Sequence, residues 1–269
     1  MTTLAIAGWR IRLCSTLPWL DEAVAARYTA FVVADGGTPD ASVTVTLEPD
    51  MPGDQQREYA ITRDGDICLL DMPCGCGKIN LSGLLATLEL ERPYFWHNLA
   101  FSLKALLAYL AFRRGGLLFH CAGVLADGEA YLFTGEGGSG KSTVVSLSPD
   151  KVALNDDLVV LRRDGPSWWA YGTPFWNEEA THRDGQTASG PVAGILRLVQ
   201  DERVFLEPVS AALAASELTV NCPTVNIDPA ELLAVIGRCR ELADAVTMQR
   251  LHFRKNPSFW DVLQLRDVK

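Results

Sequence analysis

A glycine-rich segment near the middle of the 269-residue chain carries residue types that bind phosphate. Residues 135–143 read Gly-Glu-Gly-Gly-Ser-Gly-Lys-Ser-Thr and fit the pattern G-x-x-x-x-G-K-S/T in full. Glycines let backbone N–H groups point inward around phosphate oxygens, and a following helix would add a partial positive charge. Lys141 can reach the β- and γ-phosphates, and the Ser142 hydroxyl can bind Mg²⁺. The pattern predicts a nucleoside triphosphate site, with ATP expected, formed by Gly135, Gly137, Gly138, Ser139, Gly140, Lys141, Ser142 and Thr143.

Two adjacent carboxylates follow this segment, between the apolar residues 152–154 and 158–160. A strand that brings Asp156 and Asp157 back to the phosphate loop would allow two tasks. One carboxylate can hold Mg²⁺, and the other can accept the proton of an attacking hydroxyl. A solvated turn between two strands would explain the same residues, but the complete phosphate-loop pattern beside them favours the functional interpretation.

His120 is a third candidate for chemistry. It lies in the apolar run 117–123, and the hairpin partner of this run leads into the glycine-rich segment. A lone histidine on an apolar strand is usually a packed core residue. Its proximity to the glycine-rich segment through this hairpin raises the functional interpretation beside the structural one.

Local patterns predict the elements that position these residues. Asp-Gly dipeptides at 64–65, 127–128 and 164–165 lie between runs of β-forming residues and predict hairpins. Asp201-Glu202 predicts a fourth hairpin between residues 195–200 and 203–209. Helices are expected over residues 96–114 and 229–245. The fold class is therefore mixed α/β with much antiparallel sheet, divided near residue 90 into a small strand-rich region (1–90) and a larger body (91–269).

The order of these functional residues resembles the catalytic domain of the HPr kinase/phosphorylase family. The shared features are a histidine, 15 residues to the first glycine of the loop, Gly-Lys-Ser, and then paired aspartates, within residues 117–163. The resemblance implies a P-loop fold related to that of phosphoenolpyruvate carboxykinase. It also implies that Asp156 is the general base toward a serine acceptor, that Asp157 helps to hold the metal, and that His120 orients the base.

The sequence also departs from that family. Thr143 stands where HPr kinases usually carry a glutamate, and Pro149 ends the helix after the loop early. The glycine-rich segment that the bifunctional enzymes use in dephosphorylation is not recognisable. These departures argue against phosphorylase activity and against HPr as the substrate, and they affect the expectation of kinase activity less. A polar loop at about the expected distance contains Glu178, Glu179, His182 and Arg183, of which Arg183 could stabilise a transferred phosphoryl group or simply be an exposed loop arginine.

Composition excludes several partners. The 24 basic and 33 acidic residues give a net charge of −9, which argues against broad nucleic-acid binding. The first residues do not have an export-signal pattern, and the longest apolar stretch (99–112) is short for a bilayer and contains Lys104. Seven scattered cysteines suit reduced thiols. We therefore expect a cytoplasmic protein with no membrane or nucleic-acid partner.

Together these features predict an ATP- and Mg²⁺-dependent kinase whose acceptor is a hydroxyl group. The expected acceptor is serine of a peptide or small protein, and smaller relatives of the family modify natural-product precursor peptides. A kinase for free serine or a similar metabolite, and a nucleotide-binding regulatory module without transfer, remain alternatives. HPr kinases form hexamers, so the resemblance allows a homo-oligomer. The expected catalytic residues are Asp156, His120 and Lys141, and the expected metal ligands are Ser142 and Asp157.

Overall fold

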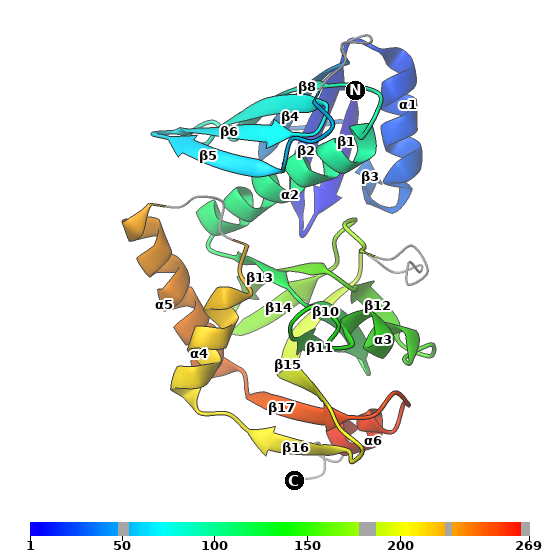
Figure 1. Ribbon diagram of the computed structural model, residues 1–269, viewed down its shortest axis with the longest axis vertical. Helices are drawn as coiled ribbons and strands as arrows, with labels where there is room; N and C mark the ends of the chain where they lie inside the picture. Colours follow the sequence, from blue (N-terminus) through cyan, green and yellow to red (C-terminus); the bar gives the residue numbers. More distant parts are fainter. Residues whose placement is uncertain (48–53, 178–186, 224–227, 265–269) are drawn as a thin grey trace. The chain divides into compact units, whose positions relative to one another are not determined.

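The computed structural model contains two β-sheets, and each belongs to a separate unit of the chain (Figure 1). It describes residues 1–47, 54–177, 187–223 and 228–264. The first unit comprises Met1–Arg114 with residues 228–230, and the second comprises the described residues of 115–223 and 231–264. Parallel and antiparallel pairs occur in both sheets, so the mixed α/β class expected from the sequence is confirmed.

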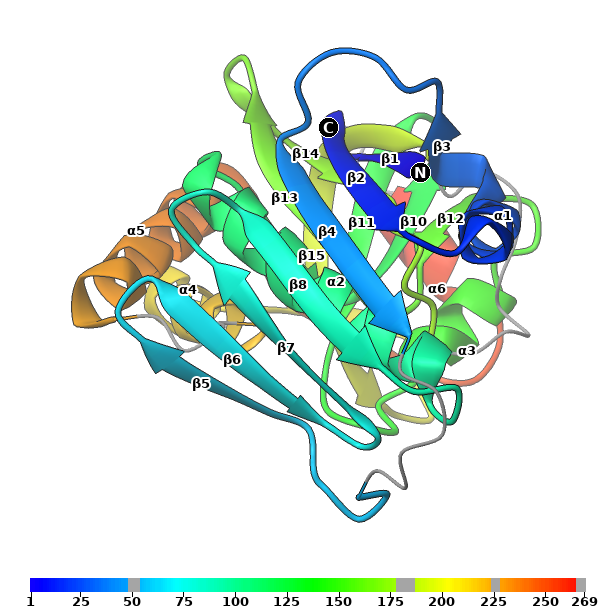
Figure 2. The same cartoon turned by 90° about the horizontal axis from the view of Figure 1, so that it is seen from above.

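The first unit is built on an eight-stranded sheet in the order β3-β1-β2-β4-β8-β7-β6-β5, whose broad face is visible in Figure 2. The turn at Asp64-Gly65 joins β5 to β6 as expected. Helices α1 (Pro18–Arg27) and α2 (Phe95–Arg113) pack on this sheet. The strands are β1 (Thr2–Ile6), β2 (Trp9–Ser15), β3 (Val32–Val33), β4 (Ala41–Leu47), β5 (Ala60–Asp64), β6 (Ile67–Met72), β7 (Gly75–Asn80) and β8 (Leu85–Leu90).

Helix α2 matches the helix expected over residues 96–114. The leucines that define its apolar side are all buried, and the helix lies against β7 and β8. The first unit therefore continues beyond residue 90, the boundary expected from the sequence. The buried leucines of α2 are Leu99, Leu103, Leu106, Leu107 and Leu110.

Among the residues that the structure describes, no helix combines the length and apolar character needed to span a membrane.

The second unit contains a sheet with the path β12-β10-β11-β15-β14-β13-β9, extended by β17 on β15 and β16 on β17. The expected hairpins at Asp127-Gly128 and Asp164-Gly165 join β10 to β11 and β13 to β14. The first was expected to include His120, but the run 117–126 divides into two strands and His120 lies on β9, which pairs with β13 and not with β11. The strands are β9 (Leu117–His120), β10 (Ala122–Ala126), β11 (Glu129–Thr134), β12 (Val152–Asn155), β13 (Leu158–Asp164), β14 (Ser167–Tyr171), β15 (Ser189–Gln200), β16 (Phe205–Pro208) and β17 (Met248–Phe253). The helices are α3 (Lys141–Ser146), α4 (Ala211–Val220), α5 (Pro229–Ala245, as expected) and α6 (Phe259–Gln264).

The fourth predicted hairpin, at Asp201-Glu202, is wrong. Strand β15 does not pair with β16, because β17 lies between them, parallel to β15 and antiparallel to β16. Strand β17 buries Leu251 and Phe253 in the core, whereas no residue of β16 is fully buried. Strand β17 therefore takes the inner position, and β16 takes the edge.

A buried aromatic cluster packs against α3, the helix that follows the glycine-rich segment. Phe133 at the end of β11, Phe253 of β17 and Phe259 of α6 pack in one buried cluster with Val144 of α3. The Trp260 indole donates to Ser148 Oγ at 2.9 Å, and the Ser148 hydroxyl donates to the Val144 carbonyl at 2.8 Å. Because protein interiors are close-packed, this aromatic cluster and its hydrogen bonds hold α3 in one position.

Candidate functional site

The glycine-rich segment connects β11 to α3, so the expected strand, loop and helix follow one another. Gly135, Gly138 and Gly140 have φ angles of 148°, 78° and 110°, which favour glycine. The Ser139 N–H donates to the Glu136 carbonyl at 3.1 Å and closes a turn within the loop. Gln200 at the end of β15 donates to the Gly138 carbonyl at 2.8 Å. The loop conformation is thus fixed by its glycines, an internal turn and a neighbouring strand.

Lys141 and Ser142, the first residues of α3, lie at the end of this loop. The Lys141 ammonium donates to the Gly135 carbonyl at 2.8 Å and approaches the Glu136 carbonyl at 3.4 Å. Its charge therefore lies over the first half of the loop. Thr143 lies in the first turn of α3, where its carbonyl accepts the Leu147 N–H at 2.9 Å.

We expect Gly140→Ala to destabilise the second unit by about 2–4 kcal/mol, because two effects add. A side chain at a φ of 110° is strained, and a Cβ there would lie 2.8 Å from Cζ of buried Phe253. Gly137→Ala is the matched control in the same loop, since a Cβ at Gly137 meets nothing within 4 Å. Urea denaturation measures both free energies of unfolding, and equal values for the two variants would contradict the prediction.

Asp156 is buried beside the loop. Its Oδ2 accepts the Ser142 hydroxyl at 3.1 Å, its Oδ1 accepts the Asn177 N–H at 2.9 Å, and only 1% of the residue is exposed. Because a buried carboxylate needs hydrogen-bond donors, these contacts fix its orientation. Asp156 is therefore held against the residue expected to bind metal.

Asp157 lies against His120 instead. Strand β13 pairs with β9 so that Leu158 is opposite His120, which places His120 Nε2 3.2 Å from Asp157 Oδ1. The side chains of His120 and Asp157 are 45% and 18% exposed. The family resemblance implied the opposite arrangement, with Asp157 on the metal beside Ser142 and His120 beside Asp156. The structure instead places Ser142 against Asp156 and His120 against Asp157.

Asn155, which was not among the predicted site residues, fixes the backbone at Asp157. Its Oδ1 accepts the N–H groups of Asp157 and Leu158, both at 2.7 Å, and its Nδ2 donates to the Thr173 carbonyl at 2.9 Å. Asparagine commonly accepts hydrogen bonds from the backbone just after it, so its position before Asp-Asp was an available signal.

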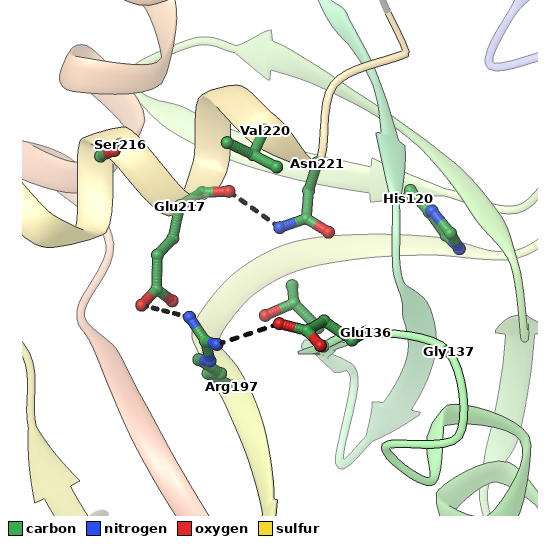
Figure 3. A pocket seen from close by; sticks show the side chains of 10 residues that line it. His120, Glu136, Gly137, Arg197, Ser216, Glu217, Val220 and Asn221 are labelled. Atoms are coloured by element: carbon green, nitrogen blue, oxygen red, sulfur yellow. Dashed lines mark hydrogen bonds and ion pairs between the residues drawn. The ribbon is translucent and has the colours of Figure 1, made fainter.

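A cavity of about 310 Å³ lies beside the loop (Figure 3). His120 is on one side of it, and Arg197 from β15 and Glu217 from α4 are on the other. Gly135 and Gly137 of the loop complete its wall, so an occupant would contact both His120 and the phosphate loop. A pocket of this size accepts a small molecule or a short side-chain segment. The other lining residues are Thr134, Glu136, Ser216, Val220 and Asn221.

Arg197 is a second residue that the sequence analysis missed. It is the one charged residue in the apolar run 195–199, which was an available signal. The arginine considered from the sequence, Arg183, lies outside the described residues, together with Glu178, Glu179 and His182.

The thiol next to His120 does not serve as a nucleophile. Cys121 is fully buried, and burial raises its pKa well above the ordinary value, although the Lys141 charge acts in the opposite direction. A buried neutral thiol is inert. The candidates for chemistry beside the loop are therefore the carboxylates and His120.

Comparison with known proteins adds distant structural similarity. No protein-family model matches the chain, and no curated protein matches it. The HPr(Ser) kinase/phosphatase from Coxiella burnetii aligns with 56% of this chain and 99% of its own, at 11% identity and a TM-score of 0.30. The geometry of the site itself therefore carries the functional interpretation.

Proposed function

We propose that the second unit is an HPr-kinase-like P-loop kinase that uses ATP and Mg²⁺ to phosphorylate a hydroxyl group. The proposed acceptor is serine of a peptide or small protein. The observation that carries this proposal is the division between two adjacent carboxylates beside one phosphate loop. Asp156 is buried against Ser142, whereas Asp157 is partly exposed against His120. Nucleotide binding alone does not require a second, accessible carboxylate.

The residues present fit a magnesium nucleotide. Mg²⁺ in kinases is held by one or two carboxylates or hydroxyls together with the substrate phosphates. Ser142 Oγ and Asp156 Oδ2, 3.1 Å apart, supply such oxygens, and Lys141 supplies a cation over the loop. Bound Mg²⁺ would neutralise charge on the β- and γ-phosphates. The phosphate-loop N–H groups and Lys141 would orient the nucleotide for in-line transfer.

Asp157 is the general base in this proposal. The acceptor oxygen forms a bond to the γ-phosphorus while the bond from that phosphorus to the β–γ bridging oxygen breaks, and ADP leaves with the electron pair. The hydroxyl proton passes to the Asp157 carboxylate, which His120 orients through Oδ1. This exchanges the roles that the family resemblance implies for Asp156 and Asp157. The reason is access, since Asp156 is 1% exposed and has donors on both oxygens.

The experiment incubates purified protein with MgATP and a panel of acceptors. The panel contains peptides and small proteins encoded beside its gene, and free serine. Mass spectrometry locates the phosphate, and calorimetry measures ATP affinity. We expect phosphoserine on a peptide or protein, lost in Lys141→Met and retained in Lys255→Met, which removes an exposed lysine of the same unit.

Three results would contradict the proposal in different ways. Phosphorylation of free serine alone would indicate a small-molecule kinase. ATP binding without transfer to any acceptor would indicate a regulatory module. Failure of the wild-type protein to bind ATP would remove the basis of the proposal.

A further inference from the structure

Strand β15 carries Arg197 to the start of the phosphate loop. It pairs in parallel with β11, and the Cα of Arg197 is opposite that of Thr134, the residue immediately before Gly135. The guanidinium lines the same cavity as Gly135, Gly137 and His120 (Figure 3). Arg197 is therefore a cation placed beside the loop by sheet register.

Two glutamates lie on either side of this guanidinium (Figure 3). Glu217 accepts from Arg197 Nη1 at 2.6 Å and has a side chain that is only 10% exposed. Glu136 of the loop lies 3.9 Å from Arg197 Nη2, and its side chain is 92% exposed. The contact to Glu217 is a short charge-assisted hydrogen bond that fixes the guanidinium, whereas the exposed contact to Glu136 contributes little.

Arg197 and Lys141 both approach residue 136. The Lys141 ammonium lies 3.4 Å from the Glu136 carbonyl, while Arg197 lies beside the Glu136 carboxylate. An anion in the first half of the loop would thus meet a cation from each element, α3 and β15. Because arginine presents several N–H donors in a planar fork, it can keep Glu217 and bind a phosphate oxygen as well.

We propose that Arg197 binds the γ-phosphoryl group of the nucleotide and stabilises its charge during transfer. This inference rests on the proposed kinase function. Glu217 holds the guanidinium in place, and the exposed Glu136 carboxylate gives way to the phosphoryl group, which carries more charge. An arginine supplied by the same chain serves this purpose in other phosphoryl-transfer enzymes.

A purely structural role for Arg197 has a matched control on the neighbouring strand. Arg250 of β17 is opposite Arg197 in the sheet and forms an ion pair with Glu207 at 3.3 Å, which is longer and more exposed than the pair of Arg197 with Glu217. The side chains of Arg250 and Arg197 are 34% and 35% exposed. Arg250 is not among the residues that line the cavity. Arg250→Met therefore removes an arginine of similar exposure and its ion pair from the same sheet, at a position that does not line the cavity.

The experiment compares the affinities for the ATP analogue AMP-PNP and for ADP, measured by calorimetry with Mg²⁺. We expect Arg197→Met to weaken AMP-PNP binding by at least about tenfold and to change ADP binding by less than about twofold, because only AMP-PNP has the third phosphate. Arg197→Lys should lose less, since it retains a charge. Arg250→Met should match the wild type for both nucleotides.

Arg197→Gln provides a second test, because glutamine can still donate to Glu217 and circular dichroism can verify its fold. A selective loss of AMP-PNP affinity in Arg197→Gln supports the inference even where Arg197→Met does not fold. Unchanged affinities, or equal losses for AMP-PNP and ADP, would overturn it while leaving the kinase proposal intact. A wild-type protein that binds neither nucleotide would overturn the kinase proposal itself.

Discussion

Asp157→Asn should lower phosphoryl transfer about a thousandfold while leaving MgATP affinity within about twofold of wild type. The substitution retains the shape of the side chain and its oxygen toward His120 Nε2, 3.2 Å away, but removes the group that accepts the proton. The nucleotide contacts assigned to Ser142 and Lys141 do not involve this carboxylate. The measurement is kcat with the acceptor identified in the panel, beside calorimetric titration with MgATP.

Asp156→Asn is the matched variant at the adjacent position, and we expect a different defect. Its carboxylate touches the Ser142 hydroxyl, so loss of its charge should weaken the use of Mg²⁺. The Mg²⁺ concentration that gives half-maximal transfer should rise at least about tenfold in this variant and stay unchanged in Asp157→Asn. The reverse pattern, with the Mg²⁺ defect in Asp157→Asn, would restore the roles implied by the family resemblance.

Local chemistry explains what the sequence could predict. The phosphate loop and three hairpins depend on glycines and Asp-Gly pairs that act over a few residues, and Asp127 and Gly128 indeed have φ angles of 54° and 84°. Helices α2 and α5 follow from apolar spacing and from the Asp228-Pro229 start signal. These features do not require knowledge of distant partners.

Non-local pairing explains what the sequence could not predict. Strand β17 enters between β15 and β16 from far along the chain, so the Asp201-Glu202 turn signal was misleading. Arg197 reaches the phosphate loop only through the register of β15 on β11. Asp156 and Asp157 are neighbours in sequence, so their spacing to the loop cannot decide which of them meets Ser142. That choice is made by the backbone turn at Asn155 and by the pairing of β9 with β13.

Asn155→Ala should therefore be one of the most damaging substitutions in the second unit, although the side chain carries no charge. Asn155 is fully buried, and its removal leaves the Asp157 and Leu158 N–H groups and the Thr173 carbonyl without these hydrogen bonds. We expect a loss of about 3–5 kcal/mol in the free energy of unfolding, since each unsatisfied buried group costs about 1–3 kcal/mol. Urea denaturation of the whole chain, followed through the unfolding of the second unit, measures this loss.

Asn256→Ala is the control for this substitution, because Asn256 makes a similar local turn through Ser258, after strand β17. Its Oδ1 accepts the Ser258 N–H at 3.1 Å, and the residue is only partly buried. We expect Asn256→Ala to cost about 1 kcal/mol or less. Under conditions in which Asn155→Ala stays folded, phosphoryl transfer should also fall. The backbone that presents Asp157 to His120 has then lost the hydrogen bonds that restrain it. Equal stability of the two variants would mean that the strand pairing alone holds Asp156 and Asp157 in position, and that Asn155 does not determine which carboxylate meets Ser142.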